Sequence, residues 1–232
     1  MSSYLSAGQD FLAAREPLPT LDILIASVYA RHDQLVALLD HLAPQLEPFD
    51  GRARVLLNVD DAVAAVGSKR NQLMLAATAR HLCFVDDDDW VHPDYVGRIM
   101  EALVDDPDTV GFRVKYSVEG VEQKPAIHSI TNDGWSETDS AYLRDISHLN
   151  PLRRSIALVG LPFNPGFGED RAWAERVKAS GLVRSEVYIE GSPMYEYRYS
   201  TSGSLFAGGP RRLGSVPELP VYAHVANVRP VI

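Results

Sequence analysis

Four consecutive aspartates, Asp86 to Asp89, follow directly after the apolar run Leu82-Cys83-Phe84-Val85. An apolar run that ends abruptly in charge is typical of a buried strand whose carboxyl end opens on a cleft, where open α/β sheets bind their ligands. The four carboxylates repel one another unless a positive group lies among them, so the cluster also predicts a cationic partner. The alternative is a solvated acidic loop.

Strand-like and helix-like segments alternate along the first hundred residues or so. Apolar runs predict buried strands at 21–27, 54–59 and 82–85. Helical spacing or composition predicts helices at 33–47, at 69–80 and from His92-Pro93-Asp94 onward. This order predicts an α/β fold with a mostly parallel, twisted sheet and helices on its faces.

The second half of the chain predicts a small antiparallel addition to that sheet. Residues 110–116 alternate as a strand with one wetter face, and Ser117-Val118-Glu119-Gly120 indicates a turn into a partner strand. The remaining expectations are a helix at 171–180, strands at 183–189 and 195–199, irregular structure at 131–145 and a loop at 200–215. Residues 1–19 are expected to be a leader, followed by a single domain over 20–232.

Net charge and cysteine usage limit the function classes. A net charge of −9 argues against a broad basic surface for nucleic acid or anionic membrane, although it leaves room for a local basic patch. The single cysteine, Cys83, excludes an intramolecular disulfide and favours a reducing compartment. The sequence shows neither a signal peptide nor a membrane-spanning run. We therefore expect a cytoplasmic protein, in the host cytoplasm if the source is viral.

The aspartate cluster is typical of a site for a hard divalent cation. Mg²⁺ and Mn²⁺ prefer carboxylate and water oxygens and usually carry phosphates. Because alternate residues of an extended segment face the same way, Asp86 and Asp88 would both face a ligand. Asp87 and Asp89 would point elsewhere unless the turn rotates them, and the sequence leaves this register open.

Several motifs, in this order, resemble those of the inverting GT-A glycosyltransferases, family two in particular. They are Ala26-Ser27-Val28-Tyr29-Ala30-Arg31 after the first strand, Asp60-Asp61 after the second, Gly67-Ser68-Lys69-Arg70-Asn71 (like Gly-x-x-Arg-Asn), the aspartate cluster (like Asp-x-Asp) and Gly168-Glu169-Asp170 before a Trp-containing helix. The resemblance covers about residues 20–199. It implies a Rossmann-like GT-A fold with a nucleotide-sugar half at about 20–108 and an acceptor half at about 109–232.

The resemblance also implies a function, that of a metal-dependent, inverting hexosyltransferase. A nucleoside-diphosphate sugar, with UDP expected first, would donate to an acceptor hydroxyl. The donor would contact Ala26, Ser27, Tyr29, Arg31, Asp60, Lys69, Arg70, Asp86 and Asp87. A Mn²⁺ or Mg²⁺ ion on Asp88 and Asp86 would neutralise the diphosphate.

Some donor-site residues have a simpler alternative reading. Lys69 and Arg70 stand at an expected helix start, where free backbone N–H groups favour anions; the alternative is a surface pair on a helix. Asp60 could accept a hydrogen bond from the imide N–H of uracil, or could serve only the turn after its strand.

The resemblance makes Asp170 the catalytic base that deprotonates the acceptor hydroxyl, with Glu169 binding the acceptor. The alternative is that both acids stabilise a first helical turn. His148 departs from the family pattern and could be a metal ligand, an acceptor contact or a structural histidine. His224 is a further candidate metal ligand, Trp135 a stacking platform for the acceptor, and Arg153 a phosphate contact.

The acceptor itself is left open by these motifs. A saccharide is one expectation. A hydroxymethylated base in phage DNA is another, for which the arginines at 153, 154, 211 and 212 could form a phosphate patch. Two other classes also compete, a nucleotidyltransferase and a non-catalytic nucleotide or sugar binding module. The segment Ser27-Val28-Tyr29 lacks the Gly-rich phosphate loop that a nucleotidyltransferase usually has after its first strand.

Overall fold

Three parallel strands form the part of the sheet that positions the site. The computed structural model describes residues 19–165, 168–200 and 228–230. Strand β1 (Leu21–Val28) lies between β2 (Ala53–Asp60) and β3 (His81–Phe84), and β13 (Val228–Pro230) is parallel to β2 on its outer side. The first three are almost completely buried, as expected of parallel strands covered on both faces. The three strands predicted in the first half are confirmed.

The second half continues the same sheet around β5 (Thr109–Val118). The short β10 (Leu152–Arg153) runs antiparallel between β3 and β5. Beyond β5 follow β7 (Ala126–His128), β9 (Tyr142–Arg144) and β8 (Ser136–Glu137). Four shorter pairings complete the sheet: β11 (Glu186–Ile189) and β12 (Tyr195–Tyr199) parallel to β5, β6 (Val121–Glu122) antiparallel to β5, and β4 (Trp90–Val91) antiparallel to β12.

The predicted fold class is therefore confirmed, with one local correction. Residues 131–145, expected to be irregular, contain β8 and β9. These strands have only two and three residues, too few for an alternating pattern to show in the sequence. The leader predicted for 1–19 and the loop predicted for 200–215 lie almost entirely outside the described residues.

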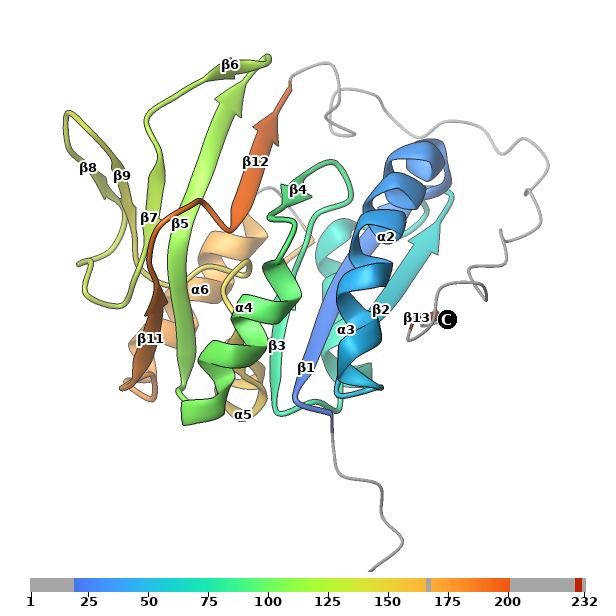
Figure 1. The fold of residues 1–232 in the computed structure, drawn as a ribbon, viewed down its shortest axis with the longest axis horizontal. Helices are drawn as coiled ribbons and strands as arrows, with labels where there is room; N and C mark the ends of the chain where they lie inside the picture. The colour runs from blue at the N-terminus through green and yellow to red at the C-terminus, as the bar shows by residue number, and fades with distance from the viewer. Residues whose placement is uncertain (1–18, 166–167, 201–227, 231–232) are drawn as a thin grey trace, which may run out of the picture.

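Helices cover both faces of the sheet (Figure 1). On one face lie α2 (His32–Leu46) and α4 (Tyr95–Ala102); on the other lie α3 (Val66–Ala76), α5 (Arg154–Ala157) and α6 (Glu169–Ala179). Alternation along β1 divides the core, because Ile23 and Ile25 pack with α2 whereas Leu24 packs with α3. No helix in the described part of the chain is long and apolar enough to cross a membrane.

Helix α3 begins earlier and ends earlier than the 69–80 predicted from composition. It starts at Val66 and ends at Ala76, and Ala77 is already extended. The buried carboxylate of Asp22 explains this end, because it accepts the backbone N–H groups of Thr78 and Ala79, each at 2.8 Å. Lys69 and Arg70 consequently lie a full turn inside the helix and are buried, not at its exposed start.

The start of α3 is packed tightly against the segment before α6. A Cβ on Gly67 would come within 2.1 Å of the backbone oxygen of Asn164, whereas a Cβ on Gly97 would meet only the flexible carboxylate of Asp94. We expect Gly67→Ala to lower the free energy of unfolding by about 1–3 kcal/mol through overpacking. Gly97→Ala, the matched control, should be neutral or stabilising by up to about 1 kcal/mol because alanine favours helix. Urea unfolding measures both, and equal effects would contradict the packing described.

Candidate functional site

The parallel strands bring three separated segments to one edge of the sheet. Val28 at the end of β1 is paired with Asp60 at the end of β2, and β3 leads into the aspartates beside them. Lys69 of α3 crosses this edge, donating from Nζ to the backbone oxygen of Ser27 at 2.6 Å and forming an ion pair with Asp60. The strand ends, the aspartate loop and α3 therefore form one polar cluster.

The four aspartates alternate between buried and accessible positions. Asp87 and Asp89 are each 3% exposed, whereas the side chains of Asp86 and Asp88 are 24% and 34% exposed. Asp87 accepts from Ser27 Oγ at 2.5 Å and from Arg31 Nη1 at 2.6 Å. The open register is thus resolved in favour of Asp86 and Asp88 as the more accessible pair.

Asp89 is held by a strand from the far end of the chain. Its carboxylate accepts from the hydroxyl of Tyr195 at 2.8 Å and from the backbone N–H of Arg198 at 2.7 Å. The same hydroxyl accepts the backbone N–H of Asp86 at 3.0 Å. Tyr195 is not among the site residues predicted from the sequence. Its alternation with Tyr197 and Tyr199 predicted a strand but did not indicate which residue that strand would meet.

Arg70 is the buried centre of the cluster. Its guanidinium donates to Asp86 and to Glu169, each at 2.7 Å, and lies 3.3 Å from Nε2 of His148. Glu169 is itself only 7% exposed. Its carboxylate therefore fixes Arg70, and a contact between Glu169 and the acceptor stays a prediction.

Burial and neighbouring charges separate the acidities of the four aspartates. Burial disfavours the charge on Asp86, but Arg70 and His148 outweigh it and hold the pKa of that carboxyl well below its usual range. For Asp88, burial prevails over the attraction of Arg31 and, with the charges of Asp86 and Asp87, raises its pKa to about 6. Burial also raises the pKa of Asp87 and, more strongly, that of Asp89.

His148 lies between the aspartate loop and the predicted base. Its Nε2 is 3.4 Å from Asp86 and its Nδ1 is 3.4 Å from Asp170, and the ring is 6% exposed. The Nδ1 atom makes no hydrogen bond to the described residues. Asp170, the second residue of α6, keeps 30% of its side chain exposed. Of the two acids that begin α6, Asp170 is thus the one that a substrate could reach.

The remaining donor-side candidates lie around the same edge. Tyr29 and Arg31 form the short 3-10 helix η1 (Tyr29–Arg31) after β1. Asp60 accepts hydrogen bonds from the backbone N–H groups of Ala62 at 3.0 Å and Ala64 at 2.7 Å. It therefore stabilises the turn that follows β2. Ala26 is partly buried against the core on the α3 face.

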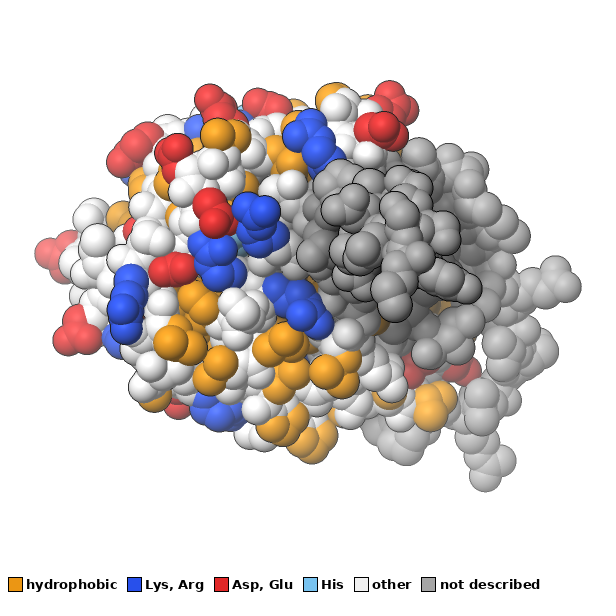
Figure 2. All heavy atoms as spheres, turned by 90° about the horizontal axis from the view of Figure 1, so that it is seen from below, with side chains coloured by type: hydrophobic (Ala, Val, Ile, Leu, Met, Phe, Trp, Pro, Cys, Tyr) orange, Lys and Arg blue, Asp and Glu red, His pale blue; other side chains and the backbone are white. Residues whose placement is uncertain are grey.

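Arg153 is not part of this cluster, which corrects the expectation that it contacts a phosphate at the site. It pairs with His81 at the amino end of β3, and its guanidinium binds Asp106 and Asp108 at 3.2 and 3.1 Å. Figure 2 views this opposite edge, where Lys and Arg side chains lie beside acidic ones. Arg154 donates to the backbone oxygen of Ala77. These arginines therefore form no phosphate patch at the site; Arg211, Arg212 and His224 lie outside the described residues.

Trp135, by contrast, lies close to the predicted base. Its ring is 43% exposed, and the guanidinium of Arg171 lies 5.5 Å from the ring centroid. Arg171 directly follows Asp170 in α6. The guanidinium that contacts Trp135 thus belongs to the residue next to Asp170, although Trp135 and Asp170 are 35 positions apart in the sequence.

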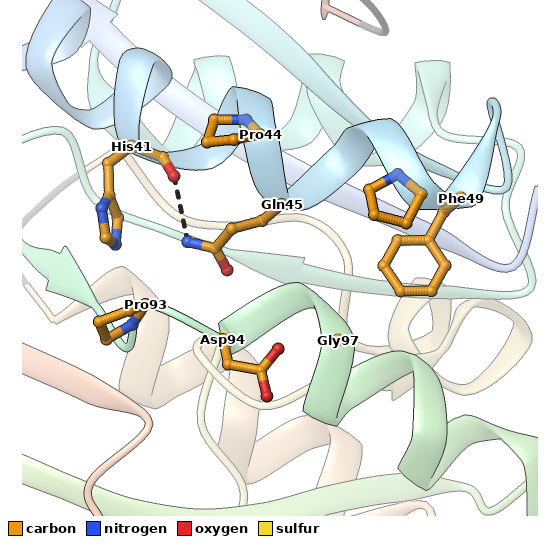
Figure 3. A pocket seen from close by; sticks show the side chains of 8 residues that line it. His41, Pro44, Gln45, Phe49, Pro93, Asp94 and Gly97 are labelled. Atoms are coloured by element: carbon orange, nitrogen blue, oxygen red, sulfur yellow. Dashed lines mark hydrogen bonds between the residues drawn. The ribbon is translucent and has the colours of Figure 1, made fainter.

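A separate hollow of about 390 Å³ lies between α2 and α4 (Figure 3). Its lining comprises His41, Pro44, Gln45, Pro48, Phe49, Pro93, Asp94 and Gly97. Within α2, Gln45 donates to the backbone oxygen of His41 at 3.1 Å (Figure 3). With no lysine or arginine in its lining, this hollow does not suit a diphosphate, and the polar cluster remains the candidate site.

The cluster fits a divalent cation that is only partly held by protein. Among the described residues, no group of three or more His, Cys, Asp or Glu side chains could hold an ion alone. The oxygens of Asp86 and Asp87 are already engaged by Arg70, His148, Ser27 and Arg31. Asp88 has the most accessible carboxylate, and Mg²⁺ commonly takes one or two carboxylates with phosphates and waters completing its shell.

The acidity of Asp88 predicts a pH-dependent stability. Its pKa of about 6 in the folded protein exceeds the 3.8 of the unfolded chain, so the fold binds this proton more tightly and stability falls as pH rises from about 4 to 6. We expect Asp88→Asn, measured in EDTA, to raise the free energy of unfolding at pH 8 by about 1 kcal/mol after allowance for solvent screening, and to change little at pH 4. The exposed Asp40→Asn is the control. A destabilised Asp88→Asn at pH 8 would contradict the charge balance described.

Comparisons with known proteins add a family and a fold. The model of a family described as Glycosyl transferase family 2 matches residues 14–159. The comparison with curated proteins found no match. Among solved structures, S. aureus TarS has a TM-score of 0.57 at 14% identity, covering 78% of this chain and 37% of TarS. The chain thus spans well under half of that protein.

Two further structures of TarS residues 1–349 contain ligands. The complex with UDP has a TM-score of 0.57 at 15% identity, covering 78% of this chain and 61% of that one. The complex with UDP-GlcNAc has a TM-score of 0.56 at 13% identity, covering 78% and 58%. At such low identities the likeness shows that the fold is shared, in agreement with the GT-A architecture predicted from the sequence.

Proposed function

Because the chain belongs to glycosyl transferase family 2, we propose that it transfers a sugar from a nucleoside-diphosphate sugar to an acceptor hydroxyl, inverting the anomeric carbon. The observation that carries this proposal is the position of Asp170. Its part-exposed carboxylate lies 3.4 Å from His148, beside the aspartate loop at the carboxyl ends of the parallel strands. UDP is the first candidate nucleotide, because structures that share the fold contain UDP and UDP-GlcNAc.

Three cations support the binding of a diphosphate at this edge. Arg31, Lys69 and Arg70 each hold a carboxylate of the cluster, at Asp87, Asp60 and Asp86 respectively. Arg70 is fixed by buried partners, whereas Arg31 also holds the accessible Asp88 at 3.1 Å. We infer that Arg31 exchanges Asp88 for a phosphate oxygen when the donor binds. A Mn²⁺ or Mg²⁺ ion held by Asp88, with Asp86 near it, would supply further positive charge to the leaving diphosphate.

The transfer itself needs one base and a stabilised leaving group. Asp170 takes the proton of the acceptor hydroxyl as its oxygen attacks the anomeric carbon from the side opposite the diphosphate. The sugar–phosphate bond breaks, and the nucleoside diphosphate leaves with the bonding electron pair. His148, placed between Asp86 and Asp170, fixes the position of the base relative to the donor side. No covalent enzyme intermediate is needed for inversion.

The two rival functions give different products. A nucleotidyltransferase would release pyrophosphate, whereas the proposed enzyme releases a nucleoside diphosphate. A non-catalytic binding module would release neither and would keep its biological effect without Asp170. The acceptor of the proposed reaction is a hydroxyl of a saccharide or of a hydroxymethylated base in DNA.

The base assignment predicts a separation of binding from catalysis. Asp170→Asn keeps the size of the side chain but cannot accept the proton, so we expect transfer to fall by about 10²–10⁴-fold. Binding of the donor, measured by isothermal titration with UDP, should stay within about threefold of wild type. Asp40→Asn on α2, far from the cluster, should affect neither. Full activity of Asp170→Asn would show that another group is the base.

The metal assignment predicts a cation-dependent stabilisation by UDP. Bound ligand raises the melting temperature by mass action, so UDP with Mn²⁺ should stabilise the wild type more than UDP with EDTA. In Asp88→Ala the difference between Mn²⁺ and EDTA should disappear. If the wild type responds equally to UDP under both conditions, Asp88 does not bind a metal with the donor.

A further inference from the structure

An aromatic strip lies beside the candidate site on the acceptor half of the chain. We define it as Trp135, Tyr142, Tyr116 and Tyr197. Tyr116 on β5 contacts Tyr142 on β9 edge-to-face and Tyr197 on β12 in a tilted arrangement, each with ring centroids 5.5 Å apart. The guanidinium of Arg144 joins Tyr142 to Trp135, at 5.5 and 4.5 Å from the two ring centroids. The strip thus spans β12, β5, β9 and the segment before β8.

Both ends of the strip lie near the candidate site. At one end, Trp135 lies under Arg171, the residue after Asp170. At the other end, burial raises the pKa of Tyr197, and the negative charges of Asp89, Asp86 and Asp170 raise it further. An acceptor lying along the strip would therefore have a hydroxyl within reach of the proposed base.

Arg144 differs in its hydrogen bonds and ion pairs from the other cations that contact the strip. Its Nη1 donates to the backbone oxygens of Ser136 at 3.1 Å and Leu143 at 2.8 Å, but its Nε and Nη2 make no hydrogen bond to the described residues. Within the described part of the chain, no carboxylate lies within ion-pair distance of it. The other two cations on the strip are paired, Arg171 with Glu175 at 3.0 Å and Lys124 with Glu137 at 3.1 Å.

An arginine fixed between two rings, with no carboxylate of the described residues at ion-pair distance, is suited to an anion from outside. Its planar fork matches the paired oxygens of a phosphate or carboxylate. Exposed aromatic rings, in turn, offer flat apolar faces to the C–H face of a sugar ring. A ligand that fits the strip therefore needs two features, a ring that stacks on Trp135 and a negatively charged group that binds Arg144.

We propose that the acceptor is an acidic saccharide, with a sugar ring stacked on Trp135 and a phosphate or carboxylate group bound by Arg144. This inference rests on the proposed glycosyl transfer and names its acceptor class. A nucleic acid strand fits less well. Such a strand carries one phosphate per nucleotide and is held by several cations. Among the described cations that contact the strip, Arg144 alone lacks a carboxylate partner, and the chain has a net charge of −9.

The test measures acceptor binding by isothermal titration in the presence of UDP and Mn²⁺. The probes are a glucuronate-containing hyaluronan tetrasaccharide, a 6-phosphorylated chitotetraose, neutral chitotetraose and a single-stranded thymidine decanucleotide. We expect one of the two acidic saccharides to bind about 10- to 100-fold more tightly than the neutral one, as for a charged hydrogen bond. Which of the two is preferred identifies the anionic group as carboxylate or phosphate.

Substitutions of Arg144 and Trp135 test whether these two residues cause the preference for an acidic saccharide. Arg144→Gln should abolish the preference for the acidic saccharide while leaving the neutral one unchanged, and Arg144→Lys should retain part of it. Trp135→Ala should weaken acidic and neutral saccharides alike. Arg80→Gln is the charge-matched control, because Arg80 is 62% exposed at the opposite edge and should behave as wild type.

The outcomes separate this inference from the proposed function. UDP binding without any saccharide binding, an acidic preference that survives in Arg144→Gln, or tighter binding of the decanucleotide would each overturn the inference and leave the donor site intact. Absence of binding by UDP or any other nucleoside diphosphate would instead refute the proposed function, and with it the acceptor assignment that depends on it.

Discussion

A single buried guanidinium, that of Arg70, holds together segments of the chain that lie up to 99 positions apart. It joins α3 to the aspartate loop through Asp86, to the start of α6 through Glu169, and to His148 between them. Removing one partner from a buried ion pair generally costs about 3–5 kcal/mol, because the other charge is left uncompensated. The position of the whole cluster, Asp170 included, therefore depends on Arg70 remaining paired.

The same reasoning explains why four adjacent carboxylates are tolerated. Asp87 and Asp89 turn inward, where Ser27, Arg31 and Tyr195 satisfy their oxygens. The two accessible aspartates then differ, because Asp86 has strong partners and Asp88 has only the ion pair with Arg31. Burial, together with the charges of Asp86 and Asp87, outweighs the attraction of Arg31 and raises the pKa of Asp88 to about 6, so this accessible carboxylate is a position where additional positive charge would be favourable.

Much of the first half could be predicted from the sequence, because its signals are local. In the sequence, buried parallel strands are apolar runs, and the carboxyl end of such a strand is marked by a sudden change to polar residues such as Asp60. The incorrect predictions concern segments whose structure depends on a residue far away in the sequence. The composition predicted that α3 continues to residue 80. The helix ends before that point, because the carboxylate of Asp22 in β1 accepts the backbone N–H of Thr78.

Pairings between distant residues limited the prediction of the site in the same way. Glu169 and Asp170 are adjacent acids that the sequence could not tell apart, and only the burial of Glu169 against Arg70 separates their roles. Arg153 was a plausible phosphate contact until β10 placed it at the amino end of β3, with Asp106 and Asp108. A hydrophobic or polar pattern in the sequence does not indicate at which edge of the sheet a strand of two residues, such as β10, places its side chains.

The two halves of the chain are constrained differently, and β5 is where they meet. On one side of β5, buried parallel strands and the Arg70 network fix the donor edge, and most substitutions there would disturb the core. On the other side, β9 carries the partly buried Tyr142 and Arg144, whose Nε and Nη2 have no hydrogen-bond partner among the described residues, and the exposed Trp135 precedes β8. Ala126 of β7 belongs to the core and Tyr142 packs against it, but exposed side chains such as Trp135 can be replaced without opening a cavity in that core. The outer strands are thus less constrained than the parallel ones, and the fold alone does not identify the acceptor.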